Sequence, residues 1–565
     1  MQSSPGQRNP SGFSRQASWL ATVAGAARPV IRPLPTTIGV LALCASLLVI
    51  YATPLGPWVF SDSTEYIVSA RNVLSGRGLG LIQASGEFQP IYLHPPLYPL
   101  ILAGGGFLGI DVAAWARVLN AILFGGTVML VAGLIHYATK SAWMAIASAL
   151  TVAINPVMLR LYTGAMPEPV FFVAGLGAML LLMSYLSLRT PWRLGAAGIL
   201  SGVAILTRYP GVVFVAVGVL GLALFGNAGL KRRTRDIGLF AVLALLPLVV
   251  WQAWLGSQYE VAFGRQWNFE TGNLWQGLVP VRIGVTTNVW GWIPYNLSLP
   301  PVPYFLKPRL LLLAAGLTVA LAAISMTRAG RRDPTPWRMA RGPQLLVLST
   351  ASAVLNLGIL AGAVAYTLPA LDLGDIDSRI LLPTQIGLML AAFTVAHLTL
   401  RAWPKWSWIR WLESAAAILF LSWYLSQSWE FVADMRQDGA GYTSREWRNS
   451  PTLKAIENLP PDLPLISSES AALTFLLDRP AYDIPELVRG EETRPFVRFG
   501  DGQDLEERLF REEGAALVFF DLSYGHFFRL YEDETEERLQ VLIHGLREHG
   551  RYADGAIYFY PSSEE

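Results

Sequence analysis

The first long polar loop of the sequence carries the residues best suited to acid–base chemistry. It reads FSDSTEYIVSARN from position 60, and it contains Asp62, Glu65 and Tyr66. On a helix predicted here, Asp62, Tyr66 and Ser69 share one face, because residues three and four apart are neighbours. A carboxylate that faces a cavity could act as a general base on an acceptor hydroxyl. Asp62 could also cap this helix, and the two roles are compatible.

Two further ionisable residues lie beside prolines. His94 opens HPPLYP (94–99) and could ligate a metal ion or bind phosphate, although a lone histidine is more often a hydrogen-bonded loop residue. The paired histidines of a zinc hydrolase motif are absent from the sequence. Glu168 stands between prolines in GAMPEPVFF. An acid there is either functional, because burial in a membrane is costly, or simply a favourable start for a helix.

Two arginines interrupt apolar sequence and suit the binding of phosphate. Arg208 lies in AILTRYPGVVF, where Tyr209 follows it, and Arg379 lies in LGDIDSRILLPT. The planar fork of a guanidinium matches the oxygens of a phosphate. The alternative is snorkelling, in which the stem lies in lipid and the charged end reaches water.

These residues alternate with long apolar stretches. Of the 565 residues, 53% are hydrophobic and 15% are charged, whereas soluble domains carry about 25% charged residues. A run of roughly 20 apolar residues can cross the hydrocarbon core of a bilayer. The eleven predicted spans are 35–56, 112–138, 142–161, 168–188, 194–207, 209–227, 237–256, 306–327, 343–367, 380–400 and 411–427. The stretch 95–110 is a twelfth span or a re-entrant helix. With this many apolar runs, the predicted fold is a mainly α, polytopic membrane protein.

The distribution of basic residues predicts the orientation. With the N-terminus inside, the cytoplasmic segments hold nineteen Lys and Arg residues against two acids, Asp236 and Asp333. Basic loops remain on the cytoplasmic side of a membrane. We therefore expect a multi-pass protein of the cell membrane, with a cytoplasmic basic tail over 1–34 that is disordered. The loop 57–95 and the C-terminus then lie outside the cytoplasm.

From about Ser428 the composition becomes that of a water-soluble domain. The predicted strands are LPLISSE (463–469), AALVFFD (515–521) and AIYFYP (556–561). Charged amphipathic helices are predicted near 503–513 and 535–548. Short strands alternating with helices indicate a small α/β domain. The chain is thus divided into the tail 1–34, a transmembrane domain 35–427 with its outer loop at 57–95, and an extracytoplasmic α/β domain 428–565.

Composition also excludes several classes. The single cysteine, Cys44, rules out a disulfide framework or a thiolate metal cluster within one chain. The net charge of +2 is spread over short loops, which does not indicate a nucleic-acid partner. Loop 257–305 is rich in aromatic residues; interfacial packing against membrane lipid is the default explanation, and stacking on a carbohydrate is the alternative.

At these residues the chain resembles the GT-C superfamily of membrane glycosyltransferases. It is most similar to the bacterial relatives of dolichyl-phosphate-mannose protein mannosyltransferases and of the lipid A aminoarabinose transferase. The motifs occur in order over 35–400 and are DSTEYIVSARNVLSGRGL, HPPLYPLILA, GAMPEPVFF, LTRYPG and DSRILLP. The stretch GYTSREWRNSPTLKAIENLP (441–460) also resembles the C-terminal domain of one bacterial branch.

The resemblance implies an inverting glycosyltransferase. It would move a hexosyl or pentosyl group from a polyprenyl-phosphate donor to a glycan, lipid or protein acceptor. Asp62 is implied to be the catalytic base, and Arg208 and Arg379 are implied to hold the phosphate leaving group. Further candidates for substrate binding are Glu65, Tyr66, His94, Glu168 and Tyr209.

The sequence departs from the family pattern at one point. Protein mannosyltransferases carry an adjacent Asp-Glu pair in this loop, whereas here Ser63 follows Asp62 and the next acid is Glu65. This departure argues against protein O-mannosylation. No outward Glu–His pair is clearly preserved, so the sequence identifies no cofactor and leaves a divalent metal open.

Two other classes of protein remain as alternatives. A transporter or flippase of lipid-linked sugars would be expected to show internal repeats and paired broken helices. A non-catalytic membrane scaffold would not need acids and arginines that converge. The enzyme interpretation predicts that they do: Asp62, His94, Glu168, Arg208 and Arg379 should line one cavity.

Overall fold

A computed structural model of the chain describes most of its residues. The described residues are 33–226, 229–258, 263–264, 266–267, 274–292, 306–332, 339–368, 376, 378–403, 405, 407–484, 508–521 and 543–560. Nearly all of the predicted tail 1–34 lies outside them.

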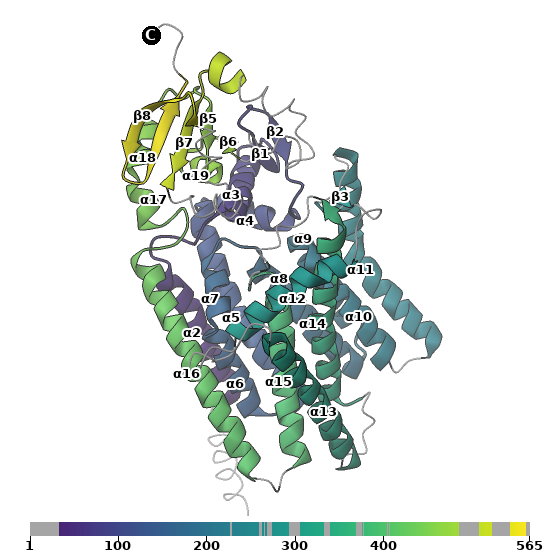
Figure 1. The fold of residues 1–565 in the computed structure, drawn as a ribbon. Coiled ribbons are helices and arrows are strands. Elements are labelled where there is room, and N and C mark those ends of the chain that lie inside the picture. The colour runs from purple at the N-terminus through teal and green to yellow at the C-terminus, as the bar shows by residue number, and fades with distance from the viewer. Residues whose placement is uncertain are drawn as a thin grey trace, which may run out of the picture.

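Helices form the larger part of the molecule (Figure 1). Among the described residues, seven helices are long and apolar enough to cross a membrane. These are α2 Pro33–Ala52, α5 Val112–Thr139, α8 Glu168–Leu188, α11 Leu230–Gln258, α13 Lys307–Arg332, α14 Arg341–Tyr366 and α15 Leu382–Ala402. The predicted class, a polytopic and mainly α-helical membrane protein, is therefore confirmed.

One predicted span is broken. α6 (Ala142–Ala153) and α7 (Pro156–Thr163) meet at an angle of 55° and count as an eighth span if taken together. The break has a local cause at Asn155, whose side chain accepts hydrogen bonds from Val157 N and Met158 N at 2.9 and 3.2 Å. Such a cap, followed by Pro156, starts a new helix, because proline lacks the N–H that would continue the old one.

The other predicted spans are also helical but differ in length. α9 (Pro191–Thr207) and α10 (Val212–Phe225) have only 17 and 14 residues, whereas α16 (Ser407–Gln437) has 31. α16 continues beyond the predicted domain boundary at 428. α4 (Leu97–Phe107) has 11 residues and is about 16 Å long, roughly half the thickness of a hydrocarbon core. The stretch 95–110 is thus too short for a twelfth span.

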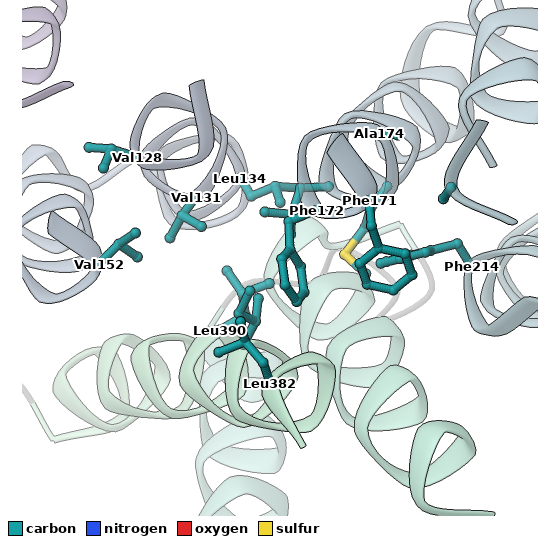
Figure 2. Close-up of a cluster of buried hydrophobic side chains, with 14 of the residues drawn as sticks. Val128, Val131, Leu134, Val152, Phe171, Phe172, Ala174, Phe214, Leu382 and Leu390 are labelled. Carbon is teal, nitrogen blue, oxygen red and sulfur yellow. The ribbon is translucent and has the colours of Figure 1, made fainter. Parts of the chain in front are cut away.

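The interior of the helical bundle is packed around α8. Figure 2 shows Phe171 and Phe172 of this helix among apolar side chains of neighbouring helices. The ring of Phe171 lies 4.9 Å from that of Phe172 and 5.3 Å from that of Phe214 on α10. A Cβ at Gly175 would lie 2.1 Å from the Phe214 ring. This close packing fixes the position of α8, which begins at Glu168.

The C-terminal part forms a five-stranded mixed sheet with the order β6-β5-β7-β9-β8. Its strands are β5 Leu465–Ser467, β6 Tyr482–Asp483, β7 Ala516–Phe520, β8 Arg547–Tyr552 and β9 Gly555–Phe559. β5 pairs in parallel with β6 and β7, while β9 pairs antiparallel with β7 and β8. Short helices accompany the sheet, namely α17 Arg445–Asn449, α18 Pro451–Glu457 and α19 Ser470–Leu477. The predicted small α/β unit and its three predicted strands are confirmed.

The two predicted amphipathic helices of this unit need correction. Residues 547 and 548, placed at the end of a helix near 535–548, instead begin strand β8. They pair with β9, because a neighbouring strand edge outweighs local helix propensity. Within 503–513, the described part is a π-helical turn, Arg508–Glu512. The other residues of both segments lie mostly outside the described part of the chain.

The sheet lies at one end of the bundle, beside the elements of the first polar loop (Figure 1). These elements are α3 Ser61–Leu74, followed by the antiparallel strands β1 Gly80–Ile82 and β2 Phe88–Pro90. Ile67 and Ala70 of α3 share one buried cluster with Leu473 of α19 and Phe520 of β7. The helix that carries Asp62 is therefore packed between the membrane helices and the α/β unit.

Candidate active site

Asp62 lies in the first turn of α3. The residue preceding the helix is Phe60, and its side chain makes no capping hydrogen bond. Arg379 Nη1 donates to Asp62 Oδ2 at 2.8 Å, across 317 positions of sequence. Asp62 therefore does not serve as the helix cap considered from the sequence, and its carboxylate forms an ion pair with Arg379 instead.

Arg379 reaches this position from the turn that precedes α15. The guanidinium carbon lies 5.4 Å from the centroid of the Phe60 ring, a cation–π distance. The neighbouring Ser378 donates to Asn288 Oδ1 of α12 (Leu274–Gly291) at 2.6 Å. The Arg379 side chain is 23% exposed and that of Asp62 is 29% exposed. The arginine thus reaches toward a carboxylate and does not snorkel into water.

A second ion pair joins Glu168 and Arg208. Glu168 is the first residue of α8, and Arg208 follows the last residue of α9. Arg208 Nη1 donates to Glu168 Oε1. Glu168 is 2% exposed, and Arg208 is the counter-ion of this buried side chain. The acid also meets the positive end of the α8 dipole, which fits its interpretation as a favourable start for a helix; a functional role of Glu168 stays a prediction.

A third contact joins Glu65 and His94, which the sequence did not pair. His94 Nε2 lies 3.2 Å from Glu65 Oε2. The His94 ring also packs 4.9 Å from the ring of Tyr66, which in turn meets Tyr98 at 5.3 Å. The only local sign in the sequence that Glu65 belongs to the site was its position three residues after Asp62 on the same helix. The position of His94 depends on the return of the loop through β1 and β2.

The three pairs influence one another electrostatically. Burial by itself would raise the pKa of Asp62, but attraction to His94, Arg379 and Arg208 lowers that pKa below its ordinary value. Burial would lower the pKa of His94, and the carboxylates of Glu65 and Asp62 outweigh it and raise that pKa. At neutral pH, Asp62 is therefore an anion and His94 is drawn toward its cationic form.

Tyr66 lies at the centre of these charges. Its side chain is 3% exposed. Burial and the negative charges of Asp62, Glu168 and Glu65 raise the pKa of its phenol well above the ordinary range, against the opposing charge of Arg208. Tyr66 is thus a neutral hydroxyl that could donate a hydrogen bond. Tyr66 and the three pairs are close enough to influence one another, and the expectation that they line one cavity stays a prediction.

Tyr209 is directed elsewhere. Its hydroxyl accepts a hydrogen bond from Trp251 Nε1 of α11 at 3.1 Å. Its ring meets that of Phe263 edge to face at 5.6 Å. Among the described residues, these contacts connect Tyr209 to α11 and the loop after it. Any role of Tyr209 in substrate binding would therefore be exerted from the side of α11.

The acids and the histidine at this site raise the question of a metal ion. Within the described parts of the chain, no group of three or more His, Cys, Asp or Glu side chains is arranged to hold one. Glu65 and His94 could supply two ligands, but Asp62 is engaged by Arg379. Because these residues do not form a complete set of ligands, we derive no step through a metal ion.

The fold and the site define a class: a multi-pass membrane protein with paired carboxylates and arginines gathered where the helical bundle meets a polar α/β unit. Residues 94–232 match the model of the dolichyl-phosphate-mannose-protein mannosyltransferase family, which is a glycosyltransferase family. The matched region contains His94, Glu168 and Arg208. Over these residues the match agrees with the resemblance to GT-C membrane glycosyltransferases. No curated protein sequence shows significant similarity to the chain.

Solved structures of three such enzymes are similar to the chain at low identity. ArnT from Cupriavidus metallidurans bound to undecaprenyl phosphate is 15% identical, with 92% of this chain and 97% of that chain covered and a TM-score of 0.47. The Archaeoglobus fulgidus oligosaccharyltransferase in complex with zinc and sulfate is 12% identical. The comparison covers 93% of this chain and 74% of that chain, with a TM-score of 0.45. The S. cerevisiae protein O-mannosyltransferase complex bound to the sugar donor is 18% identical. That comparison covers 42% of this chain and 35% of that chain, with a TM-score of 0.34.

Proposed function

We propose that the chain is an inverting glycosyltransferase that moves a sugar from a polyprenyl-phosphate donor to an acceptor hydroxyl at the outer face of the membrane. The observation that carries the proposal is the ion pair between Asp62 and Arg379, with His94 and Arg208 close enough to act on the same carboxylate. The family match over 94–232 supports the reaction class.

In this mechanism Asp62 is the general base. The acceptor hydroxyl loses its proton to the Asp62 carboxylate while the oxygen forms a bond to the anomeric carbon. The bond between that carbon and the phosphate oxygen breaks, and polyprenyl phosphate leaves with the electron pair. The leaving phosphate gains one negative charge, so cations placed beside it lower the barrier.

Arg379 and Arg208 are the cations that would stabilise this charge. Each forms an ion pair with a carboxylate, but a guanidinium has five N–H donors, so it can contact a carboxylate and a phosphate together. Arg379 would then link base and leaving group. The lowered pKa keeps Asp62 ionised at neutral pH, at the cost of basicity. We therefore assign most of the rate enhancement to stabilisation of the leaving group.

The remaining residues of the site have supporting roles in the proposal. His94, held beside Glu65, adds positive charge near Asp62. The Glu168–Arg208 pair fixes the second arginine at the ends of α8 and α9. The neutral Tyr66 hydroxyl could donate to a sugar or phosphate oxygen. The prenyl chain would remain in the membrane, which explains a site at the end of the bundle.

The test is sugar transfer by the purified protein from a panel of radiolabelled polyprenyl-phosphate sugars, with Asp62→Asn and Asp111→Asn assayed alongside. Asp111 caps α5 by accepting from Ala114 N at 2.8 Å, so its variant controls for the loss of a carboxylate. We expect Asp62→Asn to lower kcat by about 10³-fold or more, since the base and one partner of Arg379 are lost together. Equal transfer by Asp62→Asn and the wild type would remove Asp62 as base.

The stereochemistry of the product tests the rest of the mechanism. A direct displacement inverts the configuration at the anomeric carbon, whereas a covalent intermediate on Asp62 would retain it. The anomeric proton coupling in the NMR spectrum of the product distinguishes the two. Retention would exclude the role of Asp62 as a base acting in a single displacement.

A further inference from the structure

The segment that leads into Asp62 is held between two other parts of the chain. Residues 53–60 connect the end of α2 to the start of α3, and Asp62 follows Val59 by three positions. Trp58 and Val59 form isolated bridges with Gly164 and Gly441, respectively. The backbone before the proposed base is therefore paired on both sides.

The first side ties this segment to the start of α8. Trp58 N donates to Thr163 O, and Ala165 N donates to Trp58 O, both at 2.9 Å. Glu168 follows Ala165 by three positions. Asp62 and Glu168 thus each follow, by the same number of residues, one of two neighbouring backbone segments that are paired with each other.

The second side is formed by the beginning of the α/β unit. Tyr442 N donates to Val59 O at 2.8 Å, and Thr443 Oγ1 donates to Pro57 O at 2.6 Å. Arg448 Nη2 donates to Leu55 O at 2.5 Å. We call Gly441–Thr443 the strap, because it lies along the segment that precedes Asp62.

The strap approaches so closely that one residue must be glycine. Gly441 has a φ of +57°, and a Cβ there would lie 2.0 Å from Val59 O and 2.6 Å from Trp58 Cδ1. The second position of the strap is fixed from the α/β side: Tyr442 OH donates to Glu469 Oε2 at 2.8 Å. The Tyr442 ring also packs edge to face on Trp447, at 5.3 Å. The strap is therefore anchored in the core of the α/β unit.

We propose that the strap is a positioning element for Asp62, and that the hydroxyl of Thr443 is the side-chain group that fixes it in place. This inference rests on the proposed function, in which Asp62 is the base, and it gives the α/β unit a part in the reaction. Thr443 does not touch the substrate. It acts through the backbone of Pro57–Val59, which sets where α3 begins.

The expected effect is large because catalytic geometry tolerates little displacement. An error of about 1 Å in the position of a reacting group can cost roughly 10²-fold in rate. Val59 and Asp62 are separated by only two residues, and Thr64 N donates to Phe60 O at 2.8 Å in the first turn of the helix. A shift of the 57–59 backbone is thus transmitted to Asp62 and changes its distance from Arg379.

The experiment compares two matched substitutions. Thr443→Val removes the 2.6 Å bond to Pro57 O, and Thr452→Val removes a bond of equal length, from Thr452 Oγ1 to Asp554 Oδ1 inside the α/β unit. Both threonines are buried. We expect Thr443→Val to lower kcat 10- to 100-fold with the donor KM within about twofold. Thr452→Val should leave kcat unchanged, and Thr443→Ser, which keeps the hydroxyl, should restore it.

Two further readouts separate positioning from general damage. In Thr443→Val the acid limb of the pH–rate profile should move to higher pH, because Asp62 loses part of its attraction to Arg379. Hydrogen–deuterium exchange of the peptide 57–66 should accelerate in Thr443→Val but not in Thr452→Val or Thr443→Ser.

The outcomes decide the proposal. Full activity of Thr443→Val, or an equal loss of kcat in Thr452→Val, would overturn the role of the strap. If the wild type transfers no sugar from any donor, the proposed function fails. Hydrogen–deuterium exchange then still tests whether the strap holds residues 57–66 in place. Acceleration confined to Thr443→Val supports control of residues 57–66 by the strap, and unchanged exchange overturns it.

Discussion

Replacing Arg379 with glutamine tests the electrostatics of the site most directly. Arg379→Gln keeps a polar but shorter side chain and removes the charge 2.8 Å from Asp62 Oδ2. Asp62 then loses one of the attractions that outweigh its burial, so the pKa of its carboxyl should rise. The leaving phosphate would lose a cation as well.

The size of the effect follows from the geometry. Two unit charges about 4 Å apart interact by about 4 kcal/mol at an effective dielectric constant of 20. Both side chains are between a fifth and a third exposed, so solvent screening reduces this value to about 2 kcal/mol. We expect the free energy of unfolding at pH 7 to fall by about that amount. Loss of the cation beside the leaving group should lower kcat by roughly 10²- to 10³-fold.

The sign of the pH dependence can be worked out. Because the pKa of Asp62 is lower in the folded protein than in the unfolded chain, the ion pair stabilises the protein above the unfolded pKa. This stabilisation is lost as the pH falls through the folded pKa. The stability difference between the wild type and Arg379→Gln should therefore be largest near neutrality and shrink below about pH 4.

The assay combines thermal unfolding in detergent at several pH values with the pH–rate profile of kcat/KM. Activity requires ionised Asp62, so the acid limb of Arg379→Gln should lie at higher pH than that of the wild type. Arg551→Gln is the control, because its partner Glu548 forms an exposed pair that should contribute little. An unchanged acid limb together with reduced kcat would refute the electrostatic link between Arg379 and Asp62.

Two other predictions concern the second ion pair and the topology. Glu168→Gln leaves Arg208 without its buried counter-ion, so the free energy of unfolding should fall by about 2–4 kcal/mol. Glu548→Gln, at an exposed pair, is the control. Equal stability of the two variants would contradict the prediction. For the topology, the exposed Cys44 is replaced by serine, and Ser85→Cys and Thr234→Cys are introduced singly. In intact cells a membrane-impermeant maleimide should label Ser85→Cys, while Thr234→Cys should require lysis; the reverse pattern would invert the proposed orientation.

Much of the helical architecture could be predicted because apolar length is a local property. Each of the eleven predicted spans contains a helix. The errors arose where tertiary contacts compete with local preference. Residues 547 and 548 form a strand because β9 offers a partner, and the apolar run 142–161 breaks at Asn155, whose side chain caps a new helix.

The candidate residues of the site could be chosen from the sequence, and their function stays a prediction, but their partners could be predicted only in part. Asp62, Glu168, Arg208 and Arg379 were recognised because charges are costly at the edge of apolar runs. Their pairing was not predictable from spacing. Glu65 and His94 were not paired from the sequence, because no short motif connects a helix residue to a loop 29 positions later.

The sequence by itself determined the class of protein, the candidate spans and the residue types that could do chemistry, because hydrophobic length and buried charge act through local free energies. Only the tertiary structure decided that Asp62 meets Arg379 across 317 positions. It also decided that the strap at Gly441–Thr443 lies against Pro57–Val59. Such pairings depend on how helices and loops pack in three dimensions. Gly441, where a Cβ would lie 2.0 Å from Val59 O, resembles any other glycine in the sequence.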